Sequence, residues 1–332
     1  MIKFLAFVAV LGVLVVIAGA GVALWGLYHY GGQLPDHQQL ADYEPPTLTR
    51  IHAGDGRLLA EYATEKRVFV PIDAMPKRLV KAFIAAEDKN FYHHFGVDLF
   101  GVARAAIQNL INMGTAKRLV GASTITQQVA KNFLLTNEVS IDRKVKEALL
   151  AIRIERAISK QRILELYLNE IFLGQRSYGV AAAALNYFNK SLDDLSLPEM
   201  AYLAGLPKGP NNYHPTRKPE AARARRDYVL RRMYEDGFIT PEELSAGVAE
   251  PIEMRKRDIE VLHAAFFTEE VRREIAARYG EEVLYEGGLS VRATVDPRLQ
   301  EIADRVLRDG LMAYDRRHGW RGPVARIAAE GD

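Results

Sequence analysis

The longest run of apolar residues lies at the start of the chain. Residues 4–28 contain no charged side chain, and about 20 such residues are enough for a helix to span a bilayer. Lys3 precedes the run, while Trp25 and Tyr28 close it, as is typical of a positive cytoplasmic end and an interfacial aromatic belt. The pattern predicts one transmembrane helix within residues 1–30, with a cytoplasmic N-terminus and the rest of the chain outside.

A cleaved signal peptide is the alternative interpretation of the same segment. The small residues at positions 18–20 resemble a cleavage site. The apolar run continues beyond them to Trp25, however, which makes it longer than the core of a signal peptide. The sequence therefore favours an uncleaved anchor.

Beyond the anchor the pattern changes from a polar linker to a hairpin and then to helices. The linker covers residues 31–46 and ends in two prolines. Two alternating segments flank the turn sequence Gly-Asp-Gly and predict a β-hairpin over residues 47–71. From residue 76 to about residue 237 the apolar spacing is helical, with glycine or proline at the expected helix ends. We expect a mainly α domain over residues 47–245.

The last part of the chain predicts a connection to a further domain. Thr240 and Pro241 are typical N-cap and first-turn residues of another helix. Residues 287–296 alternate like a strand, and the final residues form no closing element. We interpret residues 246–332 as a connector and the start of an absent domain, in a chain that is truncated.

Composition narrows the possible chemistry. The formal net charge is only +2, which gives no overall argument for nucleic-acid binding. The absence of cysteine excludes structural disulfides and thiolate metal sites. A function that needs positive charge must therefore concentrate it locally.

The first candidate segment is EDKNFYHHFGVD, at residues 87–98. It places two carboxylates, two histidines and aromatic side chains where an apolar helix ends. A carboxylate beside apolar residues can have a raised pKa and then act as a base near neutrality. A solvated helix end is the alternative interpretation, and the adjacent histidines diverge too much for a two-histidine metal site.

The second candidate segment is GASTITQQVAKN, at residues 121–132. Ser123 or Thr124 can cap a helix here. Thr124, Gln128 and Lys131 then share one helix face, an arrangement that suits an anionic ligand rich in hydroxyl groups. A capped helix with a solvated face is the structural alternative.

The third candidate segment is RKVKE, at residues 143–147, with three cations around one acid. These side chains could clamp a diphosphate. Alternatively, Arg143 and Glu147 form only a helix salt bridge, worth about 0.3–0.5 kcal/mol. The predicted core stripe of this helix is Ile141, Val145, Leu149 and Ile152.

Two further segments favour structural roles. Residues 160–174 are apolar on nearly all sides and predict a buried helix, in which Glu165 and Asn169 are stacked and structural. Residues 179–190 are rich in alanine and predict close helix packing, followed by a turn at the Leu-Pro-Lys-Gly-Pro sequence.

The order and spacing of these five segments resemble glycosyltransferase family 51, the peptidoglycan polymerase domain of class A penicillin-binding proteins. Residues 87–98 match the pattern EDxxFxxHxGxD, and residues 121–132 match GxSTITQQxxKN. Residues 143–147 match RKxxE, and the two helical segments complete the set. The departures are Phe172, where tyrosine is common, and the extra His93.

This resemblance implies a lysozyme-like, mainly α fold with a hydrophobic, partly mobile jaw next to the membrane. Residues 97–120 are the candidate jaw. The sequence GLSVRATVDPRLQ resembles the connector into the transpeptidase domain of 1A-type members. No Ser-x-x-Lys, Ser-x-Asn or Lys-Thr-Gly motif occurs in the chain, so we expect it to bind no penicillin.

The resemblance also implies the catalytic roles. Glu87 is similar to the base that takes the proton from the acceptor sugar 4-hydroxyl as this attacks the anomeric carbon of the donor. Lys131, Arg143 and Lys146 would stabilise the leaving diphosphate. Glu147, the second catalytic acid, would position these cations, bind a divalent ion or act on the leaving group.

The remaining site residues are expected to bind substrate. By resemblance, Thr124 and Gln128 would hold the phosphate or sugar, and Asp88, Phe91 and His94 would shape the acceptor pocket. A single displacement would invert the anomeric centre. No metal ligand is firmly implied, and a divalent cation, Mg²⁺ or Mn²⁺, at the diphosphate is left open.

The implied substrates are lipid II and the lipid-linked nascent glycan, and the implied products are a β-1,4-linked glycan and undecaprenyl diphosphate. The implied location is the bacterial inner membrane, with the catalytic domain in the periplasm and activator proteins among its partners. A lysozyme-like glycan hydrolase is one alternative function, although such an enzyme has less need for Arg143 and Lys146. A catalytically silent scaffold protein is the second alternative, although such a protein needs neither Glu87 nor Glu147.

Overall fold

The structure is a computed structural model that describes residues 49–62, 66–113, 121–135, 140–255 and 264–319, together with a few isolated positions. The chain forms two units, one of Met1–Pro45 and Glu65–Arg257 and the other of Pro46–Thr64 and Asp258–Asp332. Nearly all of the predicted anchor lies outside the described residues. Among the residues that the structure describes, no helix has the length and apolar character that a membrane span requires.

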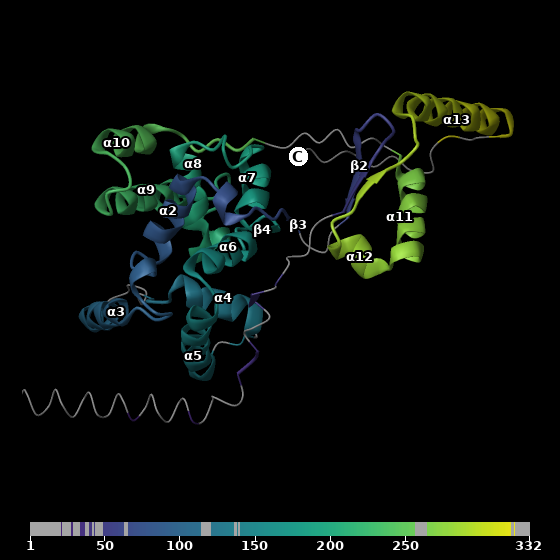
Figure 1. The fold of residues 1–332 in the computed structure, drawn as a ribbon. Coiled ribbons are helices and arrows are strands. Elements are labelled where there is room, and N and C mark those ends of the chain that lie inside the picture. The colour runs from purple at the N-terminus through teal and green to yellow at the C-terminus, as the bar shows by residue number, and fades with distance from the viewer. Residues whose placement is uncertain are drawn as a thin grey trace, which may run out of the picture. The chain divides into compact units, whose positions relative to one another are not determined.

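The first unit is a bundle of helices, coloured blue to green in Figure 1. At its centre, α2 (Lys77–Glu87) packs against α8 (Leu197–Gly205) and α9 (Pro219–Glu235). A second layer brings α4 (Ile125–Leu134) against α5 (Ile141–Ala157) and α6 (Lys160–Glu170). The helical pattern predicted from residue 76 onward is therefore confirmed.

Shorter elements complete this unit. Its other helices are α3 (Leu99–Ile111), α7 (Val180–Phe188) and α10 (Pro241–Ala249). Single turns of 3-10 helix are η2 (Ile72–Ala74), η3 (Phe91–His93), η4 (Leu206–Lys208) and η5 (Pro210–Asn212). Two short strands, β3 (Lys66–Arg67) and β4 (Ser177–Tyr178), pair in parallel.

Hydroxyl side chains fix where four of these helices begin. Each accepts a hydrogen bond from a backbone N–H of the first turn, which would otherwise have no partner. These caps are Thr124 for α4, Ser140 for α5, Ser159 for α6 and Thr240 for α10. The predicted start of a helix at Thr240 and Pro241 is confirmed.

One continuous apolar core fills the first unit, and α5 meets it with an unexpected face. The most deeply buried positions of α5 are Glu147, Leu150, Ala151 and Ile154. Val145, Leu149 and Ile152 are only partly buried, so the predicted core stripe is wrong. This helix carries apolar residues on two faces, and spacing alone could not choose between them.

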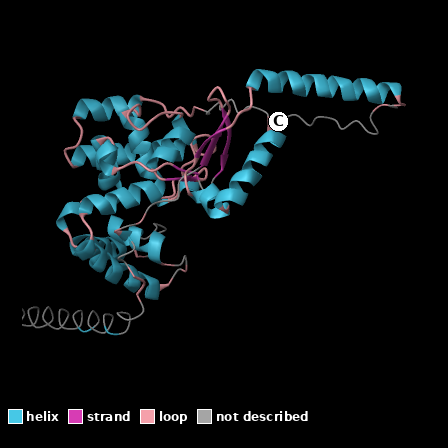
Figure 2. Ribbon diagram, turned by 45° about the vertical axis from the view of Figure 1, so that its right-hand side comes forward, coloured by secondary structure: helices cyan, strands magenta, loops and turns pink. Residues whose placement is uncertain are grey.

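The second unit contains a small sheet, shown in magenta in Figure 2. Strands β1 (Thr49–His52) and β2 (Leu58–Tyr62) form the predicted antiparallel hairpin. Strand β5 (Ser290–Arg292) pairs in parallel with β1, so the sheet order is β2-β1-β5. The same unit contains three helices. They are α11 (Ala265–Tyr279) and α12 (Glu281–Glu286), which precede β5, and α13 (Pro297–Arg317), which follows it. The hairpin thus groups with the C-terminal segment, and the expected 47–245 boundary stays a prediction.

We predict that Gly179→Ala destabilises the first unit more than Gly237→Ala. Both glycines have positive φ, +79° and +71°, where a Cβ costs about 1–3 kcal/mol. At Gly179 an added Cβ would also lie 2.4 Å from the Asn169 carbonyl oxygen, whereas at Gly237 it meets nothing within 4 Å. Urea unfolding measures the free energy of unfolding of both variants. Equal losses of stability would show that the backbone moves to relieve the close contact at Gly179.

Candidate active site

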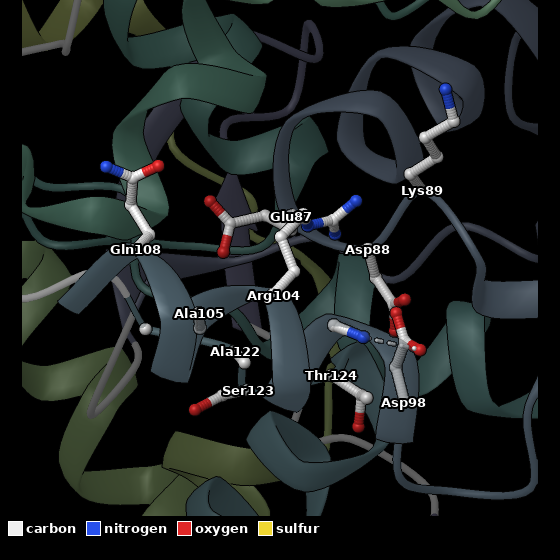
Figure 3. Close-up of a pocket in the computed structure, with 12 residues that line it drawn as sticks. Glu87, Asp88, Lys89, Asp98, Arg104, Ala105, Gln108, Ala122, Ser123 and Thr124 are labelled. Atoms are coloured by element: carbon white, nitrogen blue, oxygen red, sulfur yellow. Dashed lines mark hydrogen bonds between the residues drawn. The ribbon is translucent and has the colours of Figure 1, made fainter. Parts of the chain in front are cut away.

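Glu87 ends α2 and faces a cavity of about 270 Å³. Its side chain is only 14% exposed. Gln128 Nε2 donates to one carboxylate oxygen at 3.0 Å, and an Arg225 guanidinium nitrogen donates to the other at 3.4 Å. In Figure 3, Glu87 and Arg104 reach this cavity from α2 and α3.

The environment of Glu87 raises its pKa. Burial is the largest cause, because the charged carboxylate loses water. The Gln128 hydrogen bond and the positive charges of Arg225 and Lys208 lower the pKa in part, while the charge of Asp88 raises it further. A carboxylate with a raised pKa is a stronger base than an ordinary one, which suits it to accept a proton.

Asp88 has a different environment, although it is the next residue. Its carboxylate accepts the backbone N–H of Ile125 at 2.9 Å and contacts His94 Nε2 at 3.0 Å. His94 Nδ1 accepts from the Gly96 N–H at 3.2 Å. Asp88 thereby joins the end of α2 to the first turn of α4, and its side chain is almost completely buried.

Thr124 and Phe91 also support the site from within. The Thr124 hydroxyl donates to the Gly96 carbonyl at 2.6 Å and caps α4. Thr124 still lines the Glu87 cavity, together with Ser123. Phe91 has no exposed surface and lies under the Lys160 ammonium, 4.3 Å from its ring centroid. Phe91 therefore supports the site from below and offers no surface to a ligand.

A second cavity, of about 510 Å³, is lined in part by Gln128. Gln128 and Lys131 line it from α4, and Phe172 and Tyr178 line it from the segment after α6. No carboxylate among the described residues forms an ion pair with Lys131. The structure thus places an available ammonium group in a cavity that shares Gln128 with the Glu87 site.

The RKVKE segment does not form the predicted group of three cations around one acid. Arg143 lies 3.2 Å from Glu147, and Lys144 contacts the other oxygen of Glu147. Lys146 pairs instead with Asp142 at 3.0 Å. The reason is helical geometry, since positions 142 and 146 lie one turn apart on a face that Glu147 does not share.

Glu147 is buried, and Lys144 connects it to the first cavity. The Lys144 ammonium donates to the Ser123 hydroxyl at 2.8 Å, and Ser123 lines that cavity. Two cations already neutralise Glu147, which leaves it poorly suited as a ligand for a divalent ion. Within the described residues no group of three or more histidine, aspartate or glutamate side chains could hold a metal.

Glu165 and Asn169 have the structural roles that the sequence predicts. Glu165 accepts the N–H of Ile72 at 2.9 Å. Asn169 exchanges two hydrogen bonds with the backbone of Val70, each 2.9 Å long. These contacts attach the segment before α2 to the buried helix α6.

Three cations near Glu87 were not assigned to the site from the sequence. Arg104 lines its cavity, Arg225 contacts its carboxylate, and Lys208 lowers its pKa. Arg225 belongs to the run ARARRDYVLRR, which has the composition of a solvated helix face. Its side chain is only 8% exposed and the adjacent Arg226 is buried too, so the composition of the run does not show which arginines face the interior.

Comparisons with known proteins identify the family of the chain. Residues 55–234 match the family described as Transglycosylase. Penicillin-binding protein 1A of Rickettsia conorii is 49% identical over 332 residues, which cover 99% of this chain and 42% of that protein. Penicillin-binding protein 1A of Escherichia coli K12 is 44% identical over 324 residues, 97% of this chain and 38% of that protein.

A solved structure also resembles this chain. The crystal structure of penicillin-binding protein 1A from Haemophilus influenzae matches with a TM-score of 0.51 and 33% sequence identity, covering 87% of this chain and 33% of that chain. The chain belongs to the transglycosylase family. It spans about two fifths of the length of the curated relatives that it matches.

We predict that Asp88→Asn destabilises the fold by about 1–3 kcal/mol, because it disturbs a buried carboxylate with two partners. Asp193→Asn is the matched control, since Asp193 is exposed and should change stability by less than about 0.5 kcal/mol. Thermal unfolding measures both. A neutral Asp88→Asn would contradict the role of this carboxylate in joining α2 to α4.

Proposed function

We propose that this chain is a peptidoglycan glycosyltransferase, which polymerises lipid II into β-1,4-linked glycan and releases undecaprenyl diphosphate. The observation that carries the proposal is Glu87, a mostly buried carboxylate with a raised pKa that faces a cavity. Membership of the transglycosylase family and the likeness to penicillin-binding protein 1A support it.

Glu87 is the proposed base. A sugar hydroxyl is too weak an acid to be ionised beforehand, so its proton must leave as the new bond forms. Gln128 and Arg225 fix the two oxygens of Glu87, which favours one direction of approach for the acceptor hydroxyl. Attack from that direction on the anomeric carbon would displace the diphosphate in one step and invert the anomeric centre.

The donor diphosphate needs positive charge more than it needs a proton. Lys131 is the best placed cation, because it lines the second cavity without an ion-pair partner among the described residues. Gln128 lines the second cavity and donates to Glu87, which lines the first, as expected if the acceptor lies on one side and the donor on the other. Arg143 and Lys146 are the further proposed contacts for the diphosphate.

Glu147 is proposed to position cations and not to touch the reacting atoms. Its side chain is only 1% exposed and faces Arg143 and Lys144. Of the roles expected for it, orientation of neighbouring cations fits this environment best. Asp88, Thr124 and His94 are proposed to shape the acceptor side through the backbone that they hold.

Helix α3 is the proposed contact with the lipid surface. Its apolar side chains are exposed to an unusual degree, and large exposed apolar patches mark interaction surfaces. They are Leu99, Phe100, Val102, Ile107, Leu110 and Ile111, followed by Met113. With the predicted anchor in residues 4–28, this surface would hold the site at the periplasmic face of the inner membrane, where a lipid-linked substrate resides.

We expect Glu87→Gln to lower kcat at least 10²–10⁴-fold, the usual contribution of a general base. Glu235→Gln is the control, because Glu235 lies on the surface and forms only an ion pair with Arg232. The assay incubates detergent-solubilised protein with labelled lipid II and separates polymer from monomer. Substantial synthesis by Glu87→Gln would remove the base assignment, and breakdown of preformed glycan by the wild type would indicate a hydrolase.

We expect Lys131→Ala to lower kcat roughly 10²-fold or more, the effect typical of losing one preorganised charge contact. Lys146→Ala should lower kcat by a smaller factor, because the Lys146 ammonium is already paired with Asp142. The same assay compares the two variants. Equal losses would mean that Lys146 leaves Asp142 and contacts the substrate.

A further inference from the structure

We propose that Arg225 is a positioning residue for Glu87, whose guanidinium holds the carboxylate at the cavity in a form ready to accept a proton. The inference rests on the proposed glycosyl transfer and adds a residue outside the five segments that define the family resemblance. Arg225 belongs to α9, which packs against α2. It therefore reaches Glu87 from an element that contributes no other contact to this carboxylate.

The position of the guanidinium is fixed on several sides. Arg225 Nε donates to the Gly205 carbonyl at 2.9 Å, at the end of α8. Its guanidinium carbon lies 4.8 Å from the centroid of the Tyr228 ring and 5.9 Å from that of Tyr213. These contacts aim the terminal nitrogen at Glu87, and they explain why a buried arginine is tolerated without a close ion pair.

The two oxygens of Glu87 are held to different extents. One accepts from Gln128 at 3.0 Å, and the other lies 3.4 Å from Arg225. The longer contact leaves the second oxygen less committed to its partner and therefore better able to take a proton. Arg225 thus orients this oxygen, and the oxygen can still accept a further hydrogen bond.

Several other charged or titratable groups face Glu87. Asp88 follows it on α2, Arg104 lines the same cavity from α3, and Lys208 approaches from η4. Tyr167 lies on α6, and its hydroxyl contacts Gln128 at 3.4 Å. Among these groups only Arg225 is a cation in contact with the carboxylate, so its loss should raise the pKa of Glu87 further.

Gly205 shows that the fold makes room for this arginine. Its φ of −78° is open to any residue, so backbone conformation does not require glycine there. An added Cβ would lie 2.9 Å from Arg225 Cγ. Gly205→Ala should therefore displace the guanidinium while keeping its charge, which provides a second and independent test.

The experiment measures kcat and KM for lipid II polymerisation as a function of pH. For Arg225→Gln we expect kcat to fall roughly tenfold at neutral pH, less than for loss of the base itself. Because the pKa of Glu87 rises, the acidic limb of the profile should move to higher pH, and most activity should return in alkaline buffer. Arg223→Gln removes one charge from the exposed face of the same helix and should leave the profile unchanged.

Two more variants keep the proposal falsifiable if Arg225→Gln unfolds. Arg225→Lys should restore the acidic limb in part, and Gly205→Ala should lower kcat with KM unchanged while thermal unfolding shows a folded protein. A loss that is independent of pH, or a change in KM alone, would overturn the positioning role. A wild type that makes no polymer would instead refute the proposed function, so the two failures are distinguishable.

Discussion

The site depends on the buried carboxylate of Asp88. This group accepts a backbone N–H of the first turn of α4 and contacts the ring of His94, so it fixes the end of α2 against the start of α4. Glu87 precedes it in the chain, and Gln128 lies about one helical turn beyond Ile125. The contact between Glu87 and Gln128 is therefore a consequence of the attachment that Asp88 makes. A carboxylate at a helix N-terminus is also favoured by the helix dipole, which offsets part of the cost of burying it.

Adjacent carboxylates have opposite tasks because the backbone turns between them. Asp88 has its oxygens saturated by fixed donors, and such a group holds structure. Glu87 is desolvated with partners that satisfy it only in part, and its pKa rises for that reason. A second polar layer supports the first, since Lys160 donates to the His94 carbonyl and to Glu155, and Glu155 accepts from Thr126. The proposed base therefore rests on groups whose hydrogen bonds are already complete.

Local signals in the sequence predicted local structure well. The hydroxyl caps, the hairpin turn and the helical spacing all depend on residues within one turn of each other, and the structure confirms them. The buried face of α5 and the contact of Arg225 with Glu87 depend on which helix lies opposite, and spacing along one helix cannot determine that. The parallel pairing of β1 with β5 joins residues about 240 positions apart, for which neither strand carries a local signal. The roles assigned to the site residues stay predictions.

The proposed mechanism requires positive charge on two sides of one carboxylate, and the two cations proposed to supply it are held differently. Arg225 is held by a carbonyl and aromatic rings, so it acts on Glu87 and is not free to follow a ligand. Lys131 lines a cavity with no ion-pair partner among the described residues, so it can follow a diphosphate as this leaves. Glu147 contacts Arg143 and Lys144, and its proposed task is to orient these neighbouring cations. The chain has a small net charge, yet this chemistry needs only a few cations at particular positions. A small net charge is therefore compatible with the proposed mechanism.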